Sequence, residues 1–330
     1  MSIRNLLIFC LLFACRKPGI DDPSYVAAKG SKVLVCCEGN FGWGNADFDI
    51  YSNINQTINK AVYKTQNGSK LGDVLQSATL WNGEIYLVLN NSGKIVVIDT
   101  VEFKKQREIK GFNSPRYLHA INATKALVTD LYANKVWLID RTSGIEKSFN
   151  VRGHCEQMTE SNTEIAIACS KGVIYFFNKS TQQLTDSLET GMDTRQILSY
   201  NNTFYTLGSS GTNSAVFEIS NHQKSLAWDT TTRKQKFSHF SYNAKTQLWV
   251  FLEGKKLVQM NKDFAAPRVQ FEKADANFYN LMVNQTSGEI FISNAKDYVS
   301  SGELIHLAKD YSPIKTVSTG IIPGECLILD

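Results

Sequence analysis

The sequence contains few prolines and no sustained helical period. Only 6 prolines occur in 330 residues, and all of them lie outside the strongest apolar runs. An amphipathic helix repeats apolar residues every three to four positions over several turns, and no stretch keeps that pattern. These two features argue against a helical bundle and favour strands, whose interiors exclude proline.

Three further features are scarce or missing, and each argues against a class of protein. The 35 Lys and Arg residues barely outnumber the 31 Asp and Glu residues, and no basic arm or stripe occurs, so we do not expect nucleic-acid binding. The longest apolar run is about half the length that spans a bilayer. No pair of cysteines has zinc-ligand spacing with histidine, so we do not expect a metal site.

That apolar run, residues 6–13, follows Arg4 and ends at Cys15. A short apolar segment after a positive charge is typical of a signal peptide, so residues 1–14 are excluded from the fold. Leu12-Phe13-Ala14-Cys15 resembles a bacterial lipobox, with Phe13 as a departure from the commonest pattern. We expect acylation at Cys15, which anchors a protein to a membrane, and a polar tether over residues 15–30. The alternative is a plain secretory signal with an incidental cysteine.

A unit of about 40 residues decides the architecture. The two clearest copies each contain two β-rich runs: Ile85–Leu89 with Lys94–Asp99, and Ala126–Thr129 with Lys135–Asp140. Later copies start at Ile165, Phe204, Leu248 and Ile290. These starts are 41, 39, 39, 44 and 42 residues apart, and Lys32 begins a longer first copy with an insertion near residues 40–49. Such β-rich repeats predict an all-β, seven-bladed β-propeller of four-stranded blades over residues 31–330.

In the third blade we expect strands A to D over residues 116–121, 126–130, 135–140 and 146–151, with Gly144 supplying a positive φ in a turn. The first copy lacks an A strand, and Glu325–Leu329 is an A strand with no following B strand. We therefore predict that the C-terminal strand pairs into the N-terminal blade, which removes an exposed sheet edge.

Five cysteines remain after Cys10 and Cys15 are set aside, so they cannot all pair. Cys155 and Cys169 flank a predicted hairpin, and Cys326 lies on the closing strand beside the strand that bears Cys36 and Cys37. An exported protein can oxidise such pairs, so Cys155–Cys169 and Cys36–Cys326 are candidate disulfides. The alternative is buried thiols that act as small hydrophobes.

The D-to-A and B-to-C loops of a propeller gather around one end of the central channel, where binding is usual. Here they supply aromatic rings, amides, two arginines and a few carboxylates, a mixture that suits a large amphipathic ligand. The candidate ligand-binding residues are Asn40, Phe41, Trp43, Asn90, Arg116, Tyr117, Asp130, Tyr132, Arg195, Tyr279 and Asn294. Individual polar residues among them can instead cap loop backbone.

Several segments go beyond a generic propeller, and they are strongest in the first three blades and weak from Tyr200 onward. Cys37-Glu-Gly-Asn-Phe-Gly42, Leu71–Ser77, Ser114–Tyr117 and Thr129–Tyr132 resemble segments of the YncE-like propeller lipoproteins with a DUF5074 domain from Bacteroidetes. The resemblance to the BtuG-type members implies a cell-surface, outer-membrane lipoprotein that binds cobalamin and delivers it to a TonB-dependent transporter. It implies no enzymatic activity.

Two other functions stay open. Propellers also act as protein-interaction scaffolds without a small ligand. A metal-dependent, lactonase-like enzyme is the third hypothesis, because Glu38, Asn90, Asp130, Asn294 and Glu325 supply ligand types for a divalent cation. No nucleophile–base arrangement is evident in the sequence, and a fold alone does not give an activity.

Overall fold

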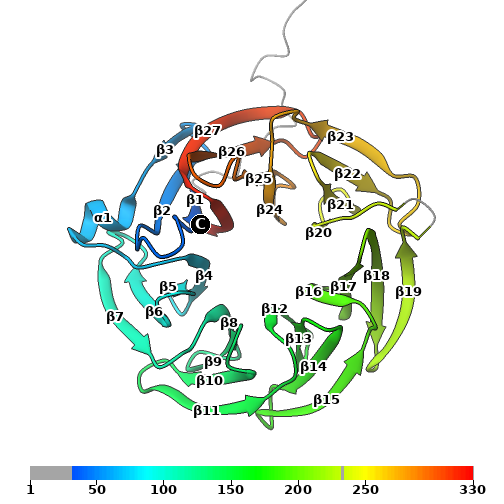
Figure 1. The fold of residues 1–330 in the computed structure, drawn as a ribbon, viewed down its shortest axis with the longest axis horizontal. Helices are drawn as coiled ribbons and strands as arrows, with labels where there is room; N and C mark the ends of the chain where they lie inside the picture. Colours follow the sequence, from blue (N-terminus) through cyan, green and yellow to red (C-terminus); the bar gives the residue numbers. More distant parts are fainter. Residues whose placement is uncertain (1–31, 232–233, 330) are drawn as a thin grey trace, which may run out of the picture.

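Seven sheets stand around a central axis in a computed structural model, which describes residues 32–231 and 234–329 (Figure 1). Each sheet has four antiparallel strands, and in each the A strand lies nearest the axis (Figure 1). The predicted seven-bladed propeller is therefore confirmed.

The strands of blades 1 to 4, from A to D, share the same order outward from the axis. They are β28 (Pro323–Leu329), β1 (Lys32–Cys37), β2 (Asp47–Ser52) and β3 (Thr57–Asn59); β4 (Leu75–Trp81), β5 (Glu84–Leu89), β6 (Lys94–Asp99) and β7 (Lys105–Lys110); β8 (Pro115–Ala120), β9 (Lys125–Asp130), β10 (Lys135–Asp140) and β11 (Gly144–Asn150); β12 (Cys155–Glu160), β13 (Glu164–Cys169), β14 (Val173–Asn178) and β15 (Gln183–Glu189).

Blades 5 to 7 repeat this arrangement. Their strands are β16 (Asp193–Tyr200), β17 (Thr203–Ser210), β18 (Asn213–Ser220) and β19 (Gln223–Asp229); β20 (His239–Asn243), β21 (Leu248–Glu253), β22 (Lys256–Met260) and β23 (Arg268–Glu272); β24 (Phe278–Val283), β25 (Ile290–Asn294), β26 (Ser301–Leu307) and β27 (Pro313–Ile321).

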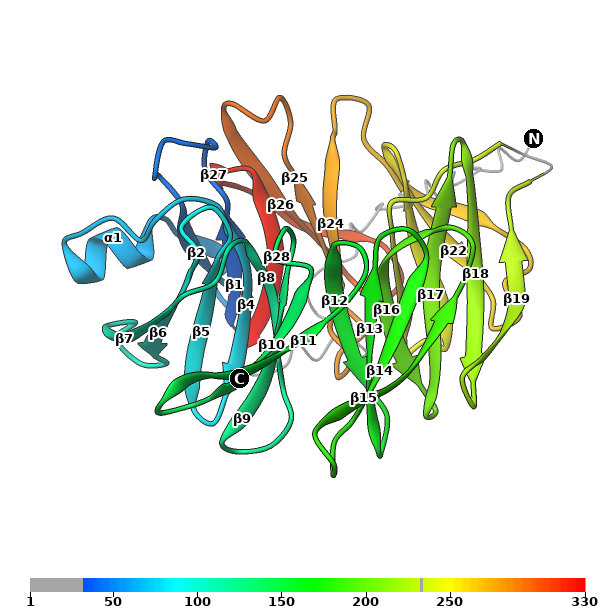
Figure 2. The ribbon, with the colours of Figure 1, turned by 60° about the horizontal axis from the view of Figure 1, so that its bottom comes forward.

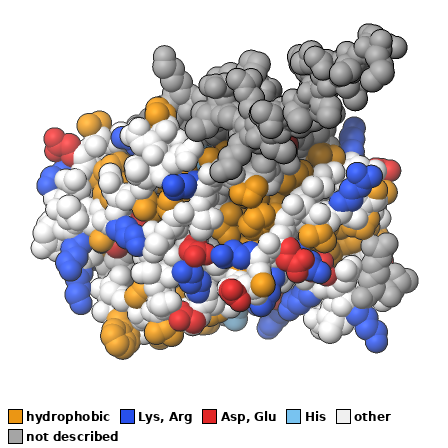
Figure 3. Space-filling view, turned by 90° about the horizontal axis from the view of Figure 1, so that it is seen from above, with side chains coloured by type: hydrophobic (Ala, Val, Ile, Leu, Met, Phe, Trp, Pro, Cys, Tyr) orange, Lys and Arg blue, Asp and Glu red, His pale blue; other side chains and the backbone are white. Residues whose placement is uncertain are grey.

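The core lies between neighbouring blades. The B and C strands are apolar on both faces, as β5 and β6 show, because each sheet is covered by a blade on either side. The D strands form the outer wall, and β15 is mostly exposed. Lys/Arg and Asp/Glu side chains are interspersed on the side wall seen in Figure 3.

The ring closes through the two ends of the chain. β28 pairs antiparallel with β1, with Lys32 opposite Leu329 and Val35 opposite Cys326. Figure 1 shows the red C-terminal strand beside the blue β1, and Figure 2 shows the same pair from a second direction. The predicted closure is confirmed, and it places β1 inside its sheet, between β28 and β2, instead of at an open edge.

The predicted boundaries of the third blade hold to within two residues, and Gly144 has a φ of 85°. The extra length of the first blade is divided between two places. One is the B-to-C loop after β1, and the other is the connection from β3 to β4, which contains the short helix α1 (Val62–Asn67). Asp47 accepts hydrogen bonds from the backbone N–H of Tyr63 (2.8 Å) and Lys64 (3.1 Å), which fixes the start of α1.

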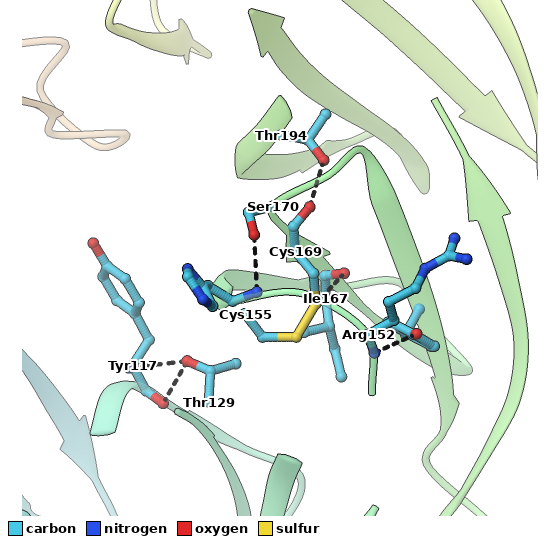
Figure 4. Close-up of a disulfide and its surroundings, with 10 residues drawn as sticks. Tyr117, Thr129, Arg152, Cys155, Ile167, Cys169, Ser170 and Thr194 are labelled. Carbon is cyan, nitrogen blue, oxygen red and sulfur yellow. Dashed lines mark hydrogen bonds between the residues drawn. A yellow bond between two sulfur atoms is a disulfide. The ribbon is translucent and has the colours of Figure 1, made fainter. Parts of the chain in front are cut away.

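One of the two candidate disulfides forms. Cys155 and Cys169 lie opposite each other on β12 and β13 and are bonded (Figure 4). The Cys36–Cys326 pairing is wrong, because Cys326 lies opposite Val35 and successive side chains alternate between sheet faces. Cys326 packs with Val35 and Cys37, whereas Cys36 packs on the other face, so all three are buried free thiols.

The predicted signal peptide, lipidated Cys15 and tether lie outside the described residues. Within residues 32–231 and 234–329, no helix has the length and apolar character to cross a membrane.

Candidate functional site: the channel mouth

The B-to-C and D-to-A loops lie at one end of the ring, which we call the mouth. The B-to-C loops of blades 1 and 7 touch there, since Asn40 donates from Nδ2 to the carbonyl oxygen of Tyr298 at 3.5 Å. Between them these loops expose large apolar side chains, with Phe41 74% and Trp43 73% exposed and Val299 also on the surface. Large apolar side chains exposed on adjoining loops are an ordinary mark of a binding site.

A polar cluster lies beneath these loops on the A strands of blades 2 to 4. Arg116 donates from Nε to Glu156 Oε2 at 2.6 Å and from Nη1 to Gln76. Tyr117 lies beside Gln76, with 3.5 Å between the hydroxyl and Nε2. Glu156 is buried and Arg116 is half-buried, so this ion pair is shielded from water on one side and open to the channel on the other.

Two further carboxyl groups face the same cluster. Glu38 accepts a hydrogen bond from the Tyr279 hydroxyl at 3.0 Å, and Glu325 accepts one from the backbone N–H of Ala78 at 3.2 Å. Burial raises the pKa of Glu38 to about 7, although the Tyr279 hydrogen bond and the charge of Arg116 oppose the rise. Burial likewise raises the pKa of Glu325 to about 8. The mouth therefore contains two carboxyl groups that titrate near neutral pH.

We call Glu38, Gln76, Arg116, Tyr117, Glu156, Tyr279 and Glu325 the mouth cluster. It combines one guanidinium, three carboxyl groups, an amide and two phenols, which can orient the polar groups of a ligand above the channel.

Three predicted site residues lie below the loop surface instead. Asp130 is fully buried and accepts hydrogen bonds from five donors, including the backbone N–H of Asn113 (2.9 Å) and the Trp137 indole (3.2 Å). Asn294 is also fully buried and accepts from Asn277 N–H at 2.7 Å. Asn90 donates to Ser114 Oγ at 2.8 Å. These side chains hold the loops in place, the capping role that the sequence left open for them.

The remaining predicted residues lie at the mouth in different settings. Tyr132 is 62% exposed and packs edge-on against His154, with ring centroids 5.5 Å apart. Tyr279 packs edge-on against Tyr298 at 5.7 Å. Arg195 is exposed and donates from Nε to Asp193 at 3.1 Å, and it is not part of the mouth cluster.

Gln76 and Glu156 are not among the residues predicted from the sequence. Both lie at the second position of an A strand, as Arg116 does, and the three are 40 residues apart from one to the next. Gln196, another 40 residues on, accepts a hydrogen bond from the backbone N–H of Phe240 at 3.2 Å. Comparing equivalent positions across the repeat would have found the whole set.

No group of three or more His, Cys, Asp or Glu side chains in the described part of the chain is arranged to hold a metal ion. Glu38 and Glu325 contact a phenol and a backbone N–H, and Asp130 and Asn294 are committed to loop backbone. The arrangement suits recognition of a ligand by hydrogen bonds, charge and aromatic contact.

Fold and mouth together define a seven-bladed β-propeller with a polar channel entrance and an aromatic rim. Residues 31–309 match the model of the domain of unknown function DUF5074, so the chain belongs to this family.

Solved structures share the fold. The chain is similar to a quinonprotein alcohol dehydrogenase-like protein from Bacteroides thetaiotaomicron, with a TM-score of 0.69 and 15% identity over 89% of this chain and 77% of that one. It is also similar to the hydrazine synthase of Kuenenia stuttgartiensis, with a TM-score of 0.63 and 12% identity over 74% of this chain and 87% of that one. At these identities the likeness extends to the fold alone. No curated protein matches the sequence.

Proposed function

We propose that this protein is a surface-exposed outer-membrane lipoprotein that binds cobalamin at the channel mouth and delivers it to a TonB-dependent transporter. We propose a binding protein and not an enzyme. The observation that carries the proposal is the pairing of an exposed aromatic rim with the half-buried mouth cluster, in a chain of the DUF5074 family.

Cobalamin is large and amphipathic, with an apolar ring system edged by amide side chains. Phe41 and Trp43 offer apolar contact area on rigid rings, which loses little side-chain entropy on binding. Arg116, Gln76 and Glu38 offer donors and acceptors for amides.

The direction of β1 suits a lipid anchor at Cys15. β1 runs from Lys32, opposite Leu329, to Cys37 immediately before the mouth loop. Lys32 is thus about 17 Å from the mouth end of the strand, given about 3.3 Å per residue. The described chain thus enters the ring at the end opposite the mouth, and attachment on that side is compatible with a mouth that faces away from the membrane.

Isothermal titration of the mature protein with cyanocobalamin tests the proposal. We expect saturable binding at micromolar or lower ligand concentration, and an absence of saturable heat in that range would refute it.

The exposed apolar loop residues Phe41, Trp43 and Val299 also favour a second candidate, a scaffold that binds another protein at the mouth. Crosslinking of intact outer membranes, with and without cobalamin, separates the two. Capture of a TonB-dependent transporter that responds to cobalamin supports delivery, whereas capture of a partner in a titration-negative protein supports the scaffold.

A further inference from the structure

Two of the junctions between blades share one contact at the end of the ring opposite the mouth. There the turn between strands C and D of one blade meets the start of strand B of the preceding blade. Between blades 2 and 3, Arg141 binds Glu84 at 3.1 Å. Between blades 4 and 5, His222 binds Glu164 at 2.9 Å and stacks on Phe176 with ring centroids 3.9 Å apart. A basic side chain and an acid thus fill each of these two junctions.

The junction between blades 5 and 6 lacks that pair. β17 begins with Thr203 where β5 and β13 begin with Glu84 and Glu164. The turn that would carry the base is replaced by a longer loop, 261–267, whose Lys262 carbonyl accepts a hydrogen bond from the Trp249 indole at 3.2 Å. A cavity of about 470 Å³ lies at this junction, and we call it the junction pocket.

Aromatic rings and charged groups line the junction pocket together. Tyr200 and Tyr205 are half-buried, so part of each ring faces the cavity. Glu218 lies opposite Tyr205 on the adjacent strand, with 3.4 Å between the hydroxyl and the carboxylate. Lys262 and Asp263 are exposed at the rim. The volume is within the range of about 300–1,000 Å³ that is usual for small-molecule sites.

We propose that the junction pocket binds a sugar ring, such as the end of a glycan. A pyranose offers an apolar face of C–H groups that can lie on a tyrosine ring, and hydroxyl groups at its edge that both donate and accept. Glu218 and Asp263 accept such hydrogen bonds and Lys262 donates them.

The charges and the polar lining narrow the ligand class. Two carboxylates against one ammonium disfavour a phosphate or another anion. A wholly apolar ligand would remove water from the Glu218 carboxylate and leave it only the long 3.4 Å contact with the Tyr205 hydroxyl, which is unfavourable. A neutral, polyhydroxylated ring meets both constraints.

This site is independent of the mouth. Tyr200 and Tyr205 flank the turn between β16 and β17, which lies at the end of the ring opposite the B-to-C loops. Figure 1 shows β16–β19 and β20–β23 as neighbouring blades, with the blade of β24–β27 between β20–β23 and β1.

Saturation-transfer NMR and titration with the methyl glycosides of glucose, galactose, mannose and N-acetylglucosamine test the proposal on the mature protein. We expect saturable binding of at least one of them with a dissociation constant of about 1 mM or lower, and no competition by cyanocobalamin. Glu218→Gln and Tyr205→Phe keep the packing and should each weaken binding about fivefold by removing a charged acceptor or a hydroxyl.

Glu272→Gln, on the outer strand β23 and outside the pocket, is the matched control and should leave the affinity within about twofold. Two outcomes would overturn the proposal: no saturation by any of the four glycosides, or equal affinity of the Glu218→Gln and Glu272→Gln proteins.

Discussion

Arg116 and Arg195 come near the start of the A strands of blades 3 and 5, yet their surroundings differ. The Arg116 side chain is 19% exposed and lies between Gln76 and Glu156, whereas the Arg195 side chain is 59% exposed and pairs with Asp193 two residues away. The position of blade 5 that corresponds to Arg116 holds Gln196, which accepts a hydrogen bond from the backbone N–H of Phe240, so the mouth is asymmetric. Its polar groups concentrate on blades 1 to 4 and 7, and the blade 5 side contributes a solvated pair.

The largest expected effect comes from removing the strand that both closes the ring and carries Glu325. Deletion of residues 324–330 should abolish cooperative unfolding, because β1 would become an open edge and the apolar surface around Val33 and Val35 would lose its cover. Differential scanning calorimetry beside the intact chain checks this. A truncated protein with an unchanged thermal transition would contradict the closure.

The closure was predictable from the sequence because it follows from counting strands. Seven B-strand starts, a first blade without an A strand and an orphan A strand at Glu325–Leu329 allow one arrangement. The positions of Phe41, Trp43 and Arg116 at the mouth were predictable for the same reason, since loops of one kind gather at one end.

Side-chain direction within a loop was less predictable. Asp130 and Asn294 face inward to backbone N–H groups, and Arg195 does not reach the cluster, since the repeat fixes strand order and not the rotamer or the local partner. The predicted Cys36–Cys326 disulfide is wrong because Cys326 lies opposite Val35, one residue before Cys36. A shift of one residue in register moves a side chain to the opposite sheet face.

Substitution of each arginine by methionine tests directly whether the two side chains contribute differently to stability. Arg116→Met should destabilise the fold by about 3 kcal/mol, because it leaves the buried Glu156 carboxylate without its cation. Arg195→Met should change stability by less than about 0.5 kcal/mol, as for other exposed pairs. Urea unfolding at neutral pH measures both. Equal changes in the free energy of unfolding would show that the Arg116 ion pair contributes no more to stability than the Arg195 pair does.

The carboxyl groups of the mouth should make stability depend on pH. The pKa of Glu325 is raised to about 8, above its value of about 4.5 in an unfolded chain, so the folded state holds more protons between these values. Stability should therefore fall as pH rises from about 5 to 8, with Glu38 contributing up to its pKa of about 7.

Glu325→Gln should flatten this dependence, because the amide does not titrate. Urea unfolding at four pH values from 5 to 8 compares the two proteins. If the free energy of unfolding varies with pH equally in the two proteins, the pKa of Glu325 is the same in the folded and unfolded states.

A smaller dependence of stability on pH, which comes from a base instead of a carboxyl group, is expected at the junction of blades 4 and 5. Burial lowers the pKa of His222, but its hydrogen bonds to Glu164 and Asp186 outweigh burial and raise it overall. This stabilisation is complete below the unfolded pKa of about 6.5 and is lost as pH rises through the raised folded value. His222→Gln should therefore destabilise more at pH 6 than at pH 9, by up to about 1 kcal/mol. If the loss of unfolding free energy in His222→Gln is the same at both pH values, His222 stabilises the junction only by packing on Phe176.

The most direct test of the account is a titration of cyanocobalamin into three proteins. These are the wild type, a Phe41→Ala/Trp43→Ala variant of the exposed mouth loop, and a Val101→Ala variant, which changes an equally exposed apolar residue between β6 and β7 at the far end of the ring. We predict micromolar or tighter binding by the wild type, a loss of about tenfold or more in the mouth variant and a change of less than about twofold in the control. No saturable binding by the wild type, or equal affinity of all three proteins, would contradict binding at the channel mouth.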